Sequence, residues 1–132
     1  MTTKLDYFIN KSVAEKIHNY LIQFKDVDFN DNARTPIIGY KRRNQRYKFA
    51  TLHGGNSYQS LVLHVDPGTR VTTVGKIKQK EIQELLLFNI SKIRGHEFKT
   101  NEVYLPLEKF DDLDSIGKIK SLIHFAYFKQ EK

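Results

Sequence analysis

Basic side chains gather in one short segment of this chain, between residues 40 and 48. The segment reads Tyr-Lys-Arg-Arg-Asn-Gln-Arg-Tyr-Lys, which places five cations and two aromatic rings within nine residues. Lysine and arginine pair with phosphate oxygens, and a tyrosine ring can stack on a base. The segment therefore predicts a surface for nucleic acid. The residues that we expect to make the contacts are Lys41, Arg42, Arg43, Arg46, Tyr47 and Lys48, with Tyr40 as a second ring that could stack.

The same cluster has a second interpretation. Charged side chains at a hairpin tip protect a sheet edge from aggregation without binding any ligand. The formal net charge of +7 favours anionic partners and speeds their encounter, but it does not identify one. Three classes of function stay open, in decreasing order of expectation. They are a non-enzymatic domain that binds nucleic acid weakly, a protein-interaction module with an accessory or inhibitory role, and a small enzyme.

Histidines and carboxylates give little support for catalysis or metal binding. The five histidines are scattered without a His-Glu-x-x-His pattern, and the absence of cysteine removes thiolate chemistry and cysteine metal sites. His64 and Asp66 lie two residues apart on one strand face and could form a small metal or acid–base pair, but such a site usually needs a third group. A strand-end histidine beside a turn aspartate is the favoured interpretation. We therefore expect no catalytic residues, no metal site and no cofactor.

Two strands must hold the basic cluster. Residues 35–42 and 46–52 have the composition of strands, and Arg43-Asn44-Gln45 between them favours a turn. A third strand is predicted over 58–65 and a later one over 102–107, because side chains of a strand point alternately to its two faces. The apolar positions expected on the inner face are Leu61, Leu63, Val65, Val103, Leu105 and Leu107.

Three amphipathic helices are predicted around these strands. The first begins at a capping box formed by Ser12 and Glu15 and spans about three turns. The second covers 81–93 and is closed by Gly95, after which we expect His96 to bond to backbone groups at the helix end. The third follows three aspartates and carries an apolar stripe at helical spacing, made of Ile116, Ile119, Leu122, Ile123 and Ala126.

The predicted order of elements is helix, three or four strands, helix, strand and helix. Consecutive strands joined by short turns favour an antiparallel meander with the helices packed on one face of it. We expect an α+β fold with a single domain over residues 1–132, a loose lead-in at 1–11 and a charged tail at 129–132. Residues 26–32 are expected to form a turn, and 70–77 a strand or an extended connection.

Residues 40–128 resemble two related groups of small bacterial domains. The motifs are a strand meander from Phe49 to Pro67, a Gly-His pair at Gly95 before the strand 101–105, and a final helix from Ile116 to Tyr127. One group is the YjbR/MmcQ (double-wing) family, of proposed DNA-binding character. The other is an uncharacterised domain described only as a predicted transport protein. The resemblance implies a YjbR-like α+β fold and no established catalytic mechanism. Directly after the Gly-His pair the chain carries Glu-Phe-Lys-Thr, where YjbR domains usually have a basic residue, His and Trp.

Length and composition favour a cytoplasmic bacterial or phage protein. A chain of 132 residues with 39% hydrophobic residues can bury its own core, and this composition argues against disorder. No run approaches the roughly eighteen apolar residues of a membrane helix, and the first residues lack the apolar region of a secretory signal. We therefore expect no membrane partner.

Overall fold

The computed structural model describes residues 5–6, 8–30, 36–54, 59–67, 71–93, 96–109 and 113–129, without the side chains of residues 93, 96 and 113–116. Within this part of the chain the elements are, in order, α1 (Lys11–Ile22), β1 (Val27–Phe29), β2 (Ile37–Arg42), β3 (Lys48–His53), β4 (Ser60–His64), α2 (Val74–Leu86), β5 (Lys92–Ile93), β6 (His96–Glu97), β7 (Glu102–Pro106) and α3 (Leu113–Phe128). A short 3-10 helix, Leu107–Lys109, follows β7.

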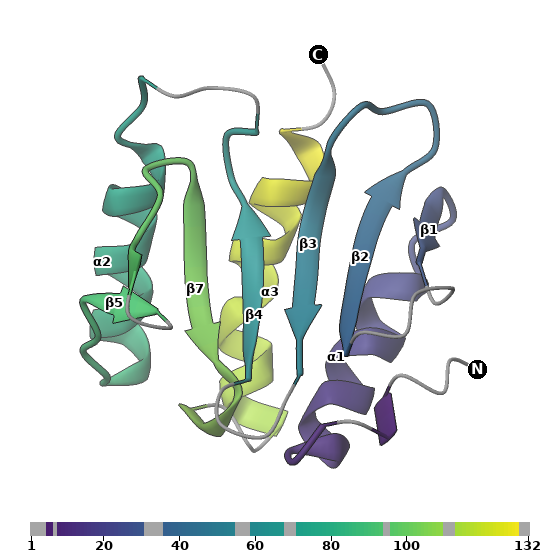
Figure 1. Ribbon diagram of the computed structural model, residues 1–132, viewed down its shortest axis with the longest axis horizontal. Coiled ribbons are helices and arrows are strands. Elements are labelled where there is room, and N and C mark those ends of the chain that lie inside the picture. Colours follow the sequence, from purple (N-terminus) through teal and green to yellow (C-terminus); the bar gives the residue numbers. More distant parts are fainter. Residues whose placement is uncertain are drawn as a thin grey trace.

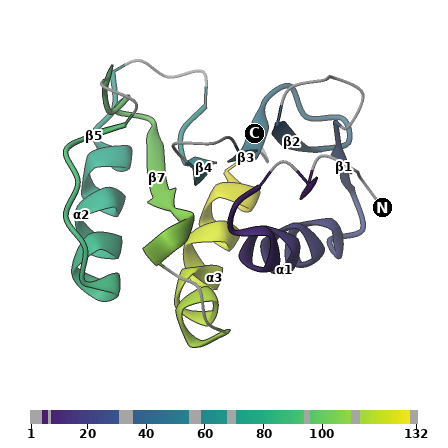
Figure 2. The ribbon, with the colours of Figure 1, turned by 60° about the horizontal axis from the view of Figure 1, so that its bottom comes forward.

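Five strands form one antiparallel sheet in the order β1-β2-β3-β4-β7, and β5 pairs with β6 separately. Helices α1 and α3 lie behind this sheet in Figure 1, and α2 stands beside β7 at the sheet edge. Figure 2 shows the three helices in a row on one side of the strands. The predicted single α+β domain, with an antiparallel sheet and helices packed against it, is therefore confirmed.

The two faces of the sheet bury different groups of residues. The residues that the alternation places on the inner face all lie in the main core, namely Leu61, Leu63, Val65, Val103, Leu105 and Leu107. On the opposite face the cross-strand partners Val62 and Tyr104 form a smaller cluster with Phe98, whose ring stacks on Tyr104. We call this opposite side of the sheet the open face, because α1 and α3 do not cover it.

Helix α2 differs most from its predicted range. It covers Val74–Leu86 instead of 81–93, so much of the segment expected to be a strand or an extended connection is helical. The helix ends at Leu87, which takes a left-handed conformation with φ of 58°. Gly95 therefore does not close this helix. Gly95 and the side chain of His96 lie outside the described residues.

The buried face of α2 explains the difference. Its buried residues are Gly75, Gln79 and Ile82, of which one has a large apolar side chain. Gln79 lies against β7, the outermost strand. Its side-chain amide donates to the Tyr104 carbonyl at 3.0 Å and accepts from the Tyr104 N–H at 2.7 Å. The helix thus supplies hydrogen bonds that a further strand would have made. Apolar periodicity does not detect a face of this kind.

Three smaller differences lie in the N-terminal part of the chain. Asn10, and not Ser12, occupies the N-cap position of α1, and no side chain caps this helix. Asn10 instead exchanges two hydrogen bonds with Gln59. Leu5 and Phe8 are buried in the main core, so the lead-in is not loose at these positions. Strand β1 forms inside the segment expected to be a turn, where it pairs with β2.

Candidate nucleic-acid interface

The predicted contact residues lie on the hairpin of β2 and β3 and on the turn that joins them. Asn44 takes a left-handed φ of 66° in this turn, which asparagine tolerates well. Five of the six side chains are exposed, namely Lys41, Arg43, Arg46, Tyr47 and Lys48. Arg42 is the exception.

A β-bulge interrupts the pairing of β2 with β3. Tyr40 pairs with Ala50, but the next pair is Lys41 with Lys48, which leaves Phe49 as the extra residue. Without the bulge, the alternation of β3 would place Lys48 on the same face as Ala50, toward the helices. With the bulge, Lys48 lies on the open face, directly across the strand pair from Lys41.

Two contacts show the effect of this bulge. Phe49 is fully buried, and its ring meets that of Tyr127 in α3 edge-on, with centroids 5.5 Å apart. Lys48 lies over Gly39 on the opposite face, since a Cβ built at Gly39 would be 2.6 Å from Lys48 Cδ. Lys41 follows Gly39 by two residues and shares its face. The two lysines are therefore neighbours of like charge on the open face.

Among the described residues, Lys41, Lys48 and Arg46 form no ion pair. Asp28 of β1 is the cross-strand partner of Lys41, but its carboxylate pairs with Arg43. The guanidinium carbon of Arg46 lies 5.4 Å from the centroid of the Tyr47 ring, and Tyr47 is 41% exposed. The hairpin thus carries three cations that form no ion pair in the described part of the chain, together with one exposed aromatic ring. Such a surface can hold phosphate groups and stack on a base.

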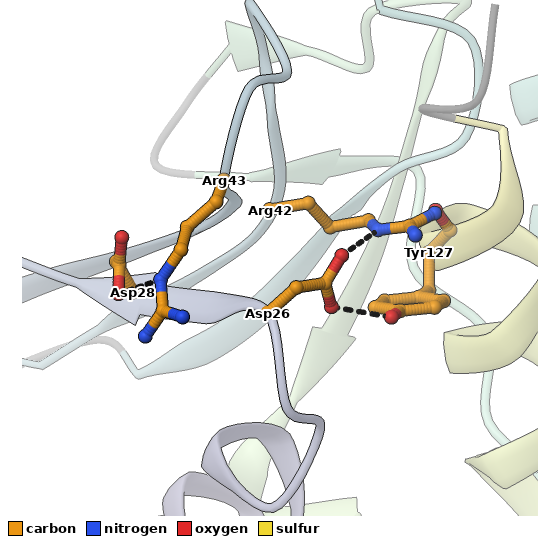
Figure 3. A network of polar contacts seen from close by, with 5 residues as sticks. All are labelled: Asp26, Asp28, Arg42, Arg43 and Tyr127. Carbon is orange, nitrogen blue, oxygen red and sulfur yellow. Dashed lines mark hydrogen bonds and ion pairs between the residues drawn. The ribbon is translucent and has the colours of Figure 1, made fainter.

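Arg42 belongs to a network beside the turn of the hairpin (Figure 3). Its Nε donates to Asp26 Oδ2 at 2.7 Å, and its Nη1 donates to the backbone carbonyl of Tyr127 at 3.3 Å. The guanidinium also lies 4.0 Å from the centroid of the Tyr127 ring, whose hydroxyl donates to Asp26 Oδ1. The Arg42 side chain is 12% exposed. Arg42, predicted as a contact residue for nucleic acid, is therefore largely buried, because this side chain ties β2 to α3.

Asp26 is ionised in this network. Burial of its carboxyl group would raise the pKa, but hydrogen bonds from Tyr127 and Arg42, together with the Arg42 charge, lower the pKa overall. The ion pair with Arg42 therefore persists at neutral pH, and the turn end of the hairpin keeps its attachment to α3.

Arg43 and Asp28 form a second ion pair, with 3.2 Å between Nε and Oδ1 (Figure 3). Both side chains are well exposed, so the pair contributes little to stability, about 0–1 kcal/mol. A phosphate group could replace Asp28 as the partner of Arg43 with little loss. Arg43 therefore stays available for an anionic ligand, unlike its neighbour Arg42.

Tyr40 is fully buried, so the expectation that its ring could stack on a base is wrong. Its hydroxyl oxygen lies 2.6 Å from Nδ1 of His18 inside the core. Burial raises the pKa of the Tyr40 hydroxyl. Of the two tyrosines in the basic cluster, Tyr47 alone offers its ring to a ligand.

A second polar network crosses the open face and links β3, β4 and β7. Thr51 Oγ1 lies 2.9 Å from His64 Nε2, and His64 Nδ1 lies 2.8 Å from Glu102 Oε2. The Tyr104 hydroxyl donates to the other carboxylate oxygen of Glu102. Burial would raise the pKa of Glu102, but the hydrogen bonds from His64 and Tyr104 outweigh it and lower the pKa to about 2.

The hydroxyl of Thr51, the imidazole of His64 and the carboxylate of Glu102 follow one another in the order that activates a hydroxyl nucleophile in some enzymes. Thr51 is only 4% exposed, however, so a substrate does not reach its hydroxyl in this conformation. The network acts as a cross-strand connection. The sequence did not indicate Thr51 or the pairing of His64 with Glu102, because these two residues become partners only through the β4–β7 register. The alternative pair of His64 with Asp66 is not formed.

Metal-binding clusters and membrane-spanning helices are both absent from the part of the chain that the structure describes. There, no group of three or more His, Cys, Asp or Glu side chains is placed to hold a metal ion. In the same residues, no helix combines the length and the apolar character needed to cross a bilayer.

Comparisons with known proteins add no assignment. Nothing matches the chain among protein-family models, curated proteins or solved structures. The resemblance to YjbR-like domains therefore stays a prediction.

Proposed function

We propose that this protein is a non-enzymatic domain that binds nucleic acid through Lys41, Arg43, Arg46, Tyr47 and Lys48. The observation that supports this most is the placement of Lys41 opposite Lys48 on the open face. Like charges directly across a strand pair are destabilising. A polyanion removes this repulsion, and its release of counterions adds to the free energy of binding.

The residues of the hairpin have different roles in this proposal. Lys41 and Lys48 contact phosphate groups on the open face, and Arg43 exchanges Asp28 for a further phosphate. The exposed ring of Tyr47 stacks on a base. Arg42 has a supporting role, because its attachment to α3 presents the other cations on a fixed element.

The number of available cations predicts weak binding. Phosphate contacts without base readout typically give dissociation constants of about 10⁻⁴–10⁻⁶ M at physiological salt, with a strong dependence on salt. We therefore expect a micromolar or weaker affinity and little preference for sequence. The DNA-binding character proposed for YjbR domains, which residues 40–128 resemble, agrees with this function.

Titration of fluorescein-labelled single-stranded and duplex oligonucleotides, at about 20 and 150 mM salt, tests the proposal by anisotropy. The double variant Lys41→Gln/Lys48→Gln should bind at least about tenfold more weakly at low salt, and its slope of log K against log salt should fall by about two. The matched control is Lys16→Gln/Lys80→Gln, which removes the same charge from exposed positions on α1 and α2.

The control variant should lose only a small part of its affinity for oligonucleotides, because its two charges attract the nucleic acid from a distance and do not contact it. Equal losses in the two double variants would show that net charge, and not the hairpin, drives binding. Absence of wild-type binding at low salt would contradict the proposal and favour a protein partner.

A further inference from the structure

A groove of about 420 Å³ lies between α2 and α3. Its apolar wall is formed by Ile82, Leu85, Leu122, Phe125 and Phe128. Leu85 and Phe128 are 49% and 53% exposed, although both are large apolar side chains. The volume and the mainly apolar lining match those of pockets that bind small molecules, which often lie between helices.

Basic side chains stand around this apolar wall. Lys78 of α2 and Lys118 of α3 line the groove, and Glu81 is the one carboxylate among the described residues that line it. Lys78 Nζ lies 4.6 Å from the centroid of the Phe125 ring, and Lys129 Nζ lies 5.8 Å from the same centroid. The groove therefore combines an apolar wall with a positive rim.

The negative charge of Glu81 does not cancel this rim. Glu81 Oε1 lies 3.5 Å from Lys78 Nζ, in a pair three residues apart on the surface of α2, and Glu81 is well exposed. Such surface pairs are weak, so the ammonium group can turn to another anion with little loss.

We propose that this groove binds a small anionic amphiphile, that is, a molecule with an apolar chain or ring and one carboxylate, sulfonate or phosphate head group. The apolar part packs against Leu85, Leu122 and Phe125. The head group meets Lys78 and Lys129, whose ammonium groups lie near the Phe125 ring. A cationic amphiphile of the same length offers the same apolar area but meets like charge. Charge therefore decides which ligand is accepted.

The site is independent of the basic hairpin. Lys41 and Lys48 lie on β2 and β3, and neither lines the groove. Binding of an amphiphile should therefore be unchanged in Lys41→Gln/Lys48→Gln, and failure of one proposal leaves the other intact.

Dodecanoate, below its micelle concentration, is a suitable probe. A titration followed by amide chemical shifts should show saturable one-to-one binding, with the largest shifts in α2 and α3. Dodecylammonium should bind at least tenfold more weakly. Lys78→Gln should also weaken dodecanoate binding several-fold, whereas Lys16→Gln, a charge removed from α1, should not.

A bulky substitution inside the groove separates this site from general apolar binding. Ser121 is exposed and lines the groove, so Ser121→Trp fills it without changing the core. This variant should abolish dodecanoate binding, while the matched control Ser12→Trp, at an exposed position of α1, should retain it.

Three results would overturn the proposal. They are the absence of saturable dodecanoate binding, equal affinity for dodecylammonium, and unchanged binding by Ser121→Trp. If an acidic amphipathic peptide shifts the groove residues and dodecanoate does not, the groove is a docking site for a partner helix instead.

Discussion

Gln79 and Tyr104 are joined by two hydrogen bonds across the edge of the sheet. The Gln79 amide donates to the Tyr104 carbonyl and accepts from the Tyr104 N–H, at 3.0 and 2.7 Å. Strand β7 is the last strand of the sheet, and its outer backbone groups would otherwise be free to pair with another chain. One side chain of α2 therefore protects the edge at the centre of β7.

The first prediction is that Gln79→Met destabilises the protein. Methionine keeps most of the volume and loses both hydrogen bonds, which leaves a buried donor and acceptor of Tyr104 unpaired. Each such group costs about 1–3 kcal/mol, so the free energy of unfolding should fall by about 2 kcal/mol or more in urea denaturation. Light scattering should also report concentration-dependent association through the exposed edge. Lys80→Met, at the exposed neighbouring position, is the control and should change neither quantity.

The second prediction compares two glycines. A Cβ at Gly75 would lie 2.3 Å from the Thr100 carbonyl oxygen and 2.8 Å from backbone atoms of Glu102, whereas one at Gly117 meets no atom within 4 Å. Gly75→Ala should therefore push α2 away from β7 and lower the melting temperature by several degrees or more. Gly117→Ala should raise stability by up to about 1 kcal/mol, because alanine favours the helix. Calorimetry measures the melting temperature of both variants. An equal change of melting temperature in the two variants would contradict the close packing of α2 against β7.

Apolar alternation could be read from the sequence wherever a strand packs on a helix layer. Leu61, Leu63, Val103 and Leu105 follow this pattern, and all are in the core. The pattern failed at α2, whose buried face meets backbone groups of a strand edge and uses glycine and glutamine for that contact. Hydrophobic periodicity has no signal for such packing.

The candidate site shows a second limit of sequence reasoning. Arg42 and Arg43 are adjacent and chemically identical, yet one lies against Tyr127 and the other is exposed beside Asp28. The alternation of side chains predicts that neighbouring residues lie on opposite faces of the sheet. It does not predict that the end of α3 lies against Arg42. The contact between Arg42 and Tyr127, which are 85 residues apart in the chain, decides which arginine is available to a ligand.

The third prediction uses these neighbours. Arg42→Gln removes the partner of Asp26 and the contact with Tyr127, so the free energy of unfolding should fall by about 1–3 kcal/mol. Arg43→Gln should change stability by less than about 0.5 kcal/mol, because its ion pair is exposed. Arg43→Gln should instead weaken oligonucleotide binding. Urea denaturation and anisotropy measure both effects, and a stable Arg42→Gln protein would show that the network does not hold the hairpin.

The last prediction concerns the stability of the fold at acidic pH. Burial alone would raise the pKa of Glu102, but the hydrogen bonds from His64 and Tyr104 outweigh it and hold the folded-state pKa at about 2, below the unfolded value near 4.5. A depressed carboxyl pKa stabilises the fold fully above the unfolded value, and this stabilisation is lost as pH falls from about 4.5 toward 2. The loss should reach up to about 3 kcal/mol, at 1.36 kcal/mol per pKa unit. Urea denaturation between pH 2 and 6 measures this loss of stability.

Other carboxylates also titrate in this range, so the difference between wild type and Glu102→Gln isolates the effect of Glu102. The control Glu84→Gln, at an exposed site on α2, should keep the wild-type slope of unfolding free energy against pH. A slope unchanged by Glu102→Gln would mean that the bonds to His64 and Tyr104 do not hold the carboxylate ionised.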